Sequence, residues 1–170
     1  MTVVRTFPTR RRAIAILDRG DAAVHALIDP LTPAQRSRHG IGGGEWSPID
    51  LLGHLASWER HGLEALEAWR AGTRAPIDVA LAARGVNGVN EDTFAAASLL
   101  PPARVLSESR RTHDALICAI RDLRDADWER PPLRRGRPLG LRLGGILGGP
   151  AGPFRHADAH LRDLRAFVER

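Results

Sequence analysis

Residues 45–55, EWSPIDLLGHL, contain the clearest helix start in the chain. Ser47 is a typical N-cap residue, and Pro48 suits the first helical position. Asp50 follows the cap by three residues, where a capping box usually carries Glu or Gln. Apolar residues then recur at helical spacing as far as residue 69, and a glycine follows at position 72. The stretch predicts a long amphipathic helix with His54 near its beginning.

Three further segments show helical periodicity, over residues 8–28, 101–123 and from about 153 to the end of the chain. Long connections separate them. Residues 73–97 are predicted to be a connection with a short helix over 87–97. Residues 125–153 are predicted to be a Gly-, Pro- and Arg-rich linker, with a short hairpin at 138–152 or a mobile loop as alternatives. We therefore expect an all-α, single-domain four-helix bundle (residues 1–170) with long crossover connections.

The composition limits the classes of partner. The chain of 170 residues has 25 basic side chains, all of them Arg, and a formal net charge of +5. Acidic residues are interleaved with the arginines, so a solvated surface is favoured over nucleic-acid binding. One cysteine excludes an internal disulfide framework. The absence of a long apolar run and of a signal peptide predicts a cytoplasmic protein that does not enter membranes.

Three histidines form the candidate metal site. His156 and His160 are four residues apart, which places their side chains on one face of a helix. With His54 from a neighbouring helix, they could hold a divalent metal and leave one coordination position open. Imidazole ligands suit Zn, Ni, Cu or Fe, so the ligand set does not choose the metal. The alternative is three unrelated histidines.

Several other residues lie near this site in the sequence, and most of them have more than one interpretation. Glu59 could act as a general base or orient a metal-binding imidazole, or it could simply be paired, while Asp158 is expected to be solvated. Trp58 could form a wall of the substrate pocket or pack in the core. Asn90 could reach the pocket or serve as a turn residue. His61 could be a spare ligand.

The remaining titratable candidates are expected to be structural. Cys118 lies among apolar helix residues and is predicted to be a buried small hydrophobe and not a nucleophile. His25, His39 and His113 have no partner pattern and are predicted to face solvent.

The chain resembles the DinB-like (DinB/YfiT) family of metalloenzymes. The residues that carry this resemblance are Trp46, Ser47, Asp50 and the run Leu52-Gly53-His54-Leu55, together with the closing pair His156 and His160. The chain also resembles the ClbS/DfsB four-helix bundle subgroup. The residues that carry this further similarity are Trp58-Glu59, Gly72, Asn90 and Asp122-Leu123-Arg124-Asp125.

The resemblance implies a crossover four-helix bundle with a metal, usually Ni or Zn, at His54, His156 and His160. It implies a small-molecule substrate and either of two activities. One is a thiol S-transferase that uses mycothiol, bacillithiol or glutathione; the other is a hydrolase that detoxifies an electrophile. Non-catalytic sequestration of a small molecule or metal is the alternative, and a homodimer stays open. The chain has no Tyr, so no phenolic acid or base can take part.

Overall fold

The computed structural model describes residues 7–170, which form eight helices. They are α1 (Arg10–Ile28), α2 (Pro33–Ser37), α3 (Pro48–Arg70), α4 (Pro76–Ser98), α5 (Pro102–Arg121), α6 (Asp125–Trp128), α7 (Leu139–Ile146) and α8 (His156–Val168). Outside the helices, the described residues contain only two isolated β-bridges and no strand. The predicted all-α class is confirmed. No helix of this part of the chain combines the length and apolar character needed to cross a membrane.

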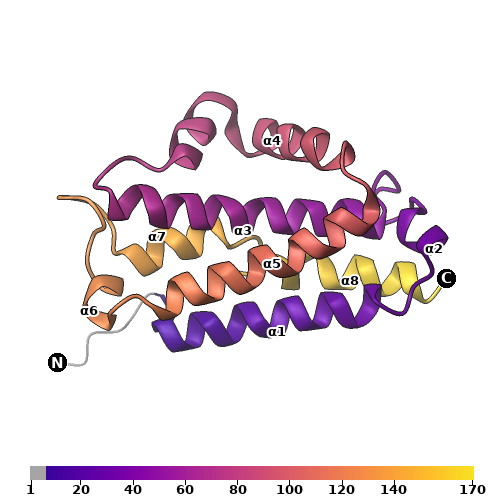
Figure 1. Cartoon of the computed structure of the whole chain (residues 1–170), viewed down its shortest axis with the longest axis horizontal. Coiled ribbons are helices and arrows are strands. Elements are labelled where there is room, and N and C mark those ends of the chain that lie inside the picture. The colour runs from indigo at the N-terminus through magenta and orange to yellow at the C-terminus, as the bar shows by residue number, and fades with distance from the viewer. Residues whose placement is uncertain (1–6) are drawn as a thin grey trace.

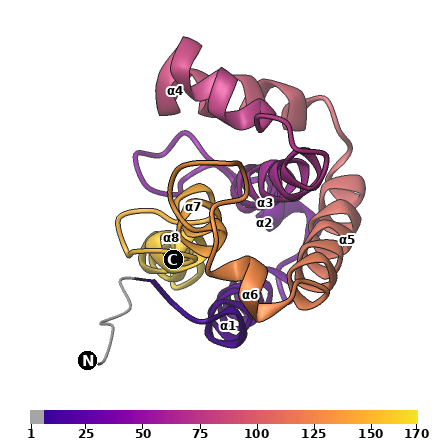
Figure 2. The ribbon, with the colours of Figure 1, turned by 90° about the vertical axis from the view of Figure 1, so that its left-hand side faces the viewer.

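Four helical columns make up the bundle. They are α1, α3, α5, and α7 followed by α8 along one line (Figure 1). Helices α3 and α5 run in the same direction, so the chain must return between them, and α4 is that crossover connection. Figure 2 shows α4 outside the four columns, beside α3. The predicted crossover topology is therefore present.

The start of α3 forms as the sequence predicts. The Ser47 side chain accepts a hydrogen bond from the Asp50 backbone N–H, and the Asp50 carboxylate accepts one from the Ser47 N–H at 2.8 Å. This reciprocal pair satisfies two backbone donors that a helix N-terminus otherwise leaves open. At the other end, Gly72 has a φ of 73°, the left-handed conformation that ends many helices. This capping box of Ser47 and Asp50 fixes where α3 begins, and hence where His54 lies on the helix.

The two predicted connections are more helical than expected. Residues 76–98 form α4, with a break at Gly85, where φ is 65°, and not a connection with one short helix. Its helical pattern is hard to recognise because only three of its residues are buried, and one of these is a glycine: Ile77, Gly88 and Val89. The Gly-rich segment forms α7 in place of a linker or hairpin, and only the isolated bridge between Gly149 and Gly152 remains of the hairpin.

Close packing explains the glycines of α7. A Cβ atom on Gly140 would lie 2.4 Å from the Trp128 ring, and one on Gly144 would lie 2.7 Å from the Phe154 ring. Both aromatic side chains are almost fully buried. Glycine is therefore required by the approach of the helix to these rings, although it is a weak helix former.

The glycines of α7 provide a matched test of this packing. Gly140→Ala is expected to lower the free energy of unfolding by about 1–3 kcal/mol, because the added methyl group overpacks the contact with Trp128. Gly145→Ala, in the same helix with open space around its Cβ position, is expected to raise stability by about 0.5–1 kcal/mol. Urea denaturation of the two variants measures both effects. Equal stabilities would contradict this account of α7.

Candidate metal centre and groove

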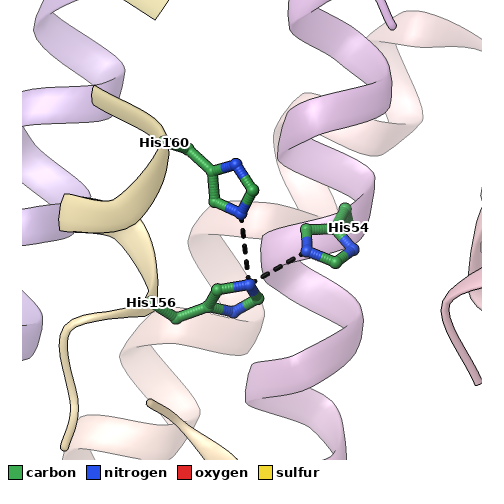
Figure 3. A group of neighbouring side chains, drawn as sticks. All are labelled: His54, His156 and His160. Carbon is green, nitrogen blue, oxygen red and sulfur yellow. Dashed lines mark hydrogen bonds between the residues drawn. The ribbon is translucent and has the colours of Figure 1, made fainter. Parts of the chain in front are cut away.

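The three predicted histidines come together from the two ends of the chain. His54 projects from α3, and His156 and His160 project from the first turns of α8, with all three rings directed toward one another (Figure 3). The Nε2 atom of His156 lies 2.9 Å from that of His54 and 3.3 Å from that of His160. One ligand nitrogen from each ring lies within 4.8 Å of the other two. The four-residue spacing therefore produces the convergence that the sequence predicts.

The donor set fits a metal ion. Two nitrogens bound tetrahedrally to one zinc, each at about 2.0–2.1 Å, lie about 3.3 Å apart, close to the two Nε2 separations here. When no ion is bound, the Nε2 atom of His156 is the contact of both neighbouring rings. Among residues 7–170, the buried Nδ1 atom of His54 has no hydrogen-bond partner. No hydrogen bond at Nδ1 therefore fixes the tautomer of His54, and an ion at Nε2 would set it.

Burial keeps these imidazoles neutral. It lowers the pKa of His54 to about 3, with the neighbouring His156 and His160 acting in the same direction. Burial and then His160 lower the pKa of His156 to about 4. Burial also lowers the pKa of His160, although the charge of Asp163 opposes it. At neutral pH, protons therefore compete little with a metal ion for the lone pairs of these rings.

The three histidines line an open groove of about 600 Å³. Its aromatic walls are Trp46 and Trp58, and α4 contributes Val86 and Asn90. The remaining lining residues come from the α7–α8 segment and from α8: Gly145, Ile146, Gly148, Gly149, Pro150, Ala159 and Asp163. A volume of this size accommodates a small organic molecule.

Both predicted pocket residues, Trp58 and Asn90, lie in this groove and bind each other. The indole Nε1–H of Trp58 donates a hydrogen bond of 2.9 Å to the Asn90 side-chain oxygen. This bond connects α3 to the crossover helix and fixes one wall beside the histidines. Trp46 packs against the site, with its ring centroid 4.8 Å from that of His54.

Sequence reasoning missed Asp163 in the groove wall. It follows His160 by three residues, so on a helix the two side chains are neighbours. The spacing His160-x-x-Asp163 was the available signal. Asp158, by contrast, forms an ion pair of 2.8 Å with Arg155. His61 does not line the groove and instead contacts Glu64 at 3.3 Å.

Glu59 lies on the inner side of α3, among buried polar groups. Its Oε1 atom accepts a hydrogen bond of 2.9 Å from His113 Nδ1, and His113 Nε2 contacts the Asp18 carboxylate at 3.2 Å. Because both ring nitrogens face carboxylates, both carry protons and His113 is an imidazolium. Burial lowers the pKa of His113, but Glu59, Asp21 and Asp18 outweigh it and raise the pKa to about 9. Burial raises the pKa of Glu59, which His113 opposes.

Two histidines predicted to face solvent are buried, and the cysteine predicted to be buried is exposed. His113 and His25 are each only 5% exposed, and His25 contacts Asp21 and Asp29. Ser109 and His113 continue the apolar stripe of α5 at helical spacing, which was the missed signal of burial. Cys118 is exposed, because it lies beside the buried stripe of Leu116 and Ile120 and not on it. His39 is exposed as predicted.

The chain belongs to the DinB superfamily. The sequence model of that superfamily matches residues 16–148, which is most of the chain. The matched range includes His54 and Glu59 and ends before His156 and His160. Comparisons with curated proteins and with solved structures found no match.

The His113 cluster predicts a pH-dependent stability. The folded pKa of about 9 exceeds the usual 6.5, so this contribution is complete below pH 6.5 and is lost as the pH rises through 9. It amounts to at most about 3 kcal/mol. The free energy of unfolding should therefore fall between pH 6.5 and 9 in the wild type and fall less in His113→Gln.

Chemical denaturation at several pH values measures this difference, with His39→Gln as the control. The chain suits the experiment because it has neither Lys nor Tyr to titrate near this range. Parallel stability profiles of the wild type and His113→Gln would show that the imidazolium is not part of the folded structure.

Proposed function

We propose that the protein is a divalent-metal-dependent enzyme that acts on a small electrophilic molecule. The observation that carries the proposal is the convergence of three neutral imidazoles in the wall of a groove large enough for such a molecule. His54, His156 and His160 would hold the ion, with Ni or Zn as the expected metal. Membership of the DinB superfamily supports this assignment.

When bound, the ion would supply Lewis acidity that lowers the pKa of a thiol or water in the groove. The side chains of the groove would contact the substrate, exclude water and accept a proton. Trp46 and Trp58 would exclude water and contact the apolar part of the substrate, while Asn90 holds the Trp58 indole in place. Asp163 is the carboxylate of the groove wall and would accept the proton released from the thiol or water.

Two reactions match this arrangement. In the first, the sulfur of a low-molecular-weight thiol such as mycothiol, bacillithiol or glutathione bonds to the electrophilic carbon, Asp163 takes the thiol proton, and the leaving group departs with its bonding electrons; the product is a thioether. In the second, the oxygen of water bonds to that carbon, Asp163 takes a proton, and the bond to the leaving group breaks, so the substrate is hydrolysed. Both belong to detoxification or stress response, in keeping with the resemblance to the ClbS/DfsB subgroup, which stays a prediction.

Metal content tests the site itself. Wild-type protein purified after equilibration with Zn²⁺ or Ni²⁺ is expected to carry about one ion per chain, and His156→Ala is expected to carry little, because two imidazoles bind much more weakly than three. Elemental analysis measures both. His39→Ala is the matched control, since this exposed histidine binds the Glu45 carbonyl instead. Equal metal content in His156→Ala and the wild type would exclude the site.

Turnover tests the activity. A panel of electrophiles is incubated with metal-loaded protein and each thiol, or with water alone, and product is followed beyond one equivalent per chain. Activity should require metal and should fall at least about 100-fold in His54→Ala, as for loss of a catalytic metal. Protection that stops at one equivalent would support the sequestering alternative and contradict catalysis.

A further inference from the structure

His156 lines two spaces in the protein. One is the substrate groove described above. The other is a small cavity with about 30 Å³ of space for water. Most of the cavity wall is apolar, but Asp21 of α1, Glu59 of α3 and Ser109 of α5 also line it. About 10–15 Å³ is enough for one water molecule, provided that polar partners are present.

The orientation of the ring turns its second nitrogen away from the groove loop. The Cδ2 edge of His156 faces the groove loop, 3.7 Å from the position of a Cβ atom on Gly149. Nδ1 occupies the opposite edge of an imidazole. Figure 3 shows Nε2 directed at His54 and His160, with the other nitrogen on the far side of the ring. Within residues 7–170, the side-chain hydrogen bonds of His156 use Nε2 and none involves Nδ1.

Glu59 offers the complementary acceptor. Its Oε1 atom binds His113, which leaves Oε2 without a protein hydrogen bond in the described chain. The side chain is 17% exposed and lines the same cavity as His156. No direct hydrogen bond joins the two residues among those described, so a hydrogen-bonded connection between them needs a bridging group, and the cavity has room for water.

We propose that a buried water molecule in this cavity accepts a hydrogen bond from His156 Nδ1–H and donates one to Glu59 Oε2. Glu59 is then a positioning residue for a metal ligand. The bridge holds the proton of His156 on Nδ1 and leaves the Nε2 lone pair for the ion, as carboxylate partners do for histidines in other metal sites. The consequence for affinity rests on the proposed metal function.

Metal affinity gives the first test, and the cluster around His113 offers a matched control. Glu59→Gln and Asp18→Asn each replace a carboxylate partner of His113 with an amide, but only Glu59 lines the cavity. The Kd for Zn²⁺ is measured by competition with a chromophoric chelator. Glu59→Gln should weaken binding about 10-fold, and Asp18→Asn should change it less than about 2-fold.

Two outcomes of the affinity measurement would overturn the proposal. One is a Glu59→Gln Kd within about 2-fold of the wild type. The other is equal weakening by both variants, which would mean that the effect passes through the His113 cluster. If the wild type binds no Zn²⁺, the proposed function fails, and the water bridge is decided separately in metal-free protein.

NMR of the metal-free protein provides that separate decision. The ¹⁵N shifts of the His156 ring should show the Nδ1–H tautomer, and this proton should exchange with solvent more slowly in the wild type than in Glu59→Gln. Asp18→Asn should retain the wild-type exchange. An Nε2–H tautomer in the wild type, or the same exchange in Glu59→Gln, would show that the bridge does not exist.

Discussion

The structure depends on a polar layer that crosses the bundle between two apolar clusters. One cluster contains the buried residues of α6 and α7 and the second half of α3; the other contains the first turns of α3 and the end of α8. Between them, all four columns contribute polar side chains: Asp18, Asp21, His54, Glu59, Ser109, His113 and His156. An unsatisfied buried polar group costs about 1–3 kcal/mol, so the buried members of this layer, His54, Ser109 and His113, need partners.

The two halves of the layer meet this requirement differently. Toward α1 and α5, the carboxylates of Asp18 and Glu59 share the imidazolium of His113. Toward α8 there is no charge to share, since burial lowers the pKa of all three histidines. Three adjacent lone pairs are a donor set that suits a divalent cation. The internal ion pair thus satisfies one half of the layer, and the three histidines of the other half form the candidate metal centre.

Much of the fold was predictable, because its strongest signals are local. The Ser47 and Asp50 capping box determines where α3 begins, and the spacing of His156 and His160 determines that they share a face. Helix α7 was not predictable from propensity, since Gly140 and Gly144 respond to aromatic rings that are distant in the sequence. The ion pairs of His113 were not predictable for a similar reason, because its partners lie on α1 and α3 and only the fold brings them together.

X-ray absorption at the zinc edge of the loaded protein tests the central claim most directly. The account predicts three imidazole nitrogens at about 2.0–2.1 Å, with one further light-atom ligand completing the coordination. A sulfur scatterer at about 2.3 Å would place the ion at Cys118, and a shell of oxygens alone would place it on surface carboxylates. Either result would contradict a metal centre at residues 54, 156 and 160.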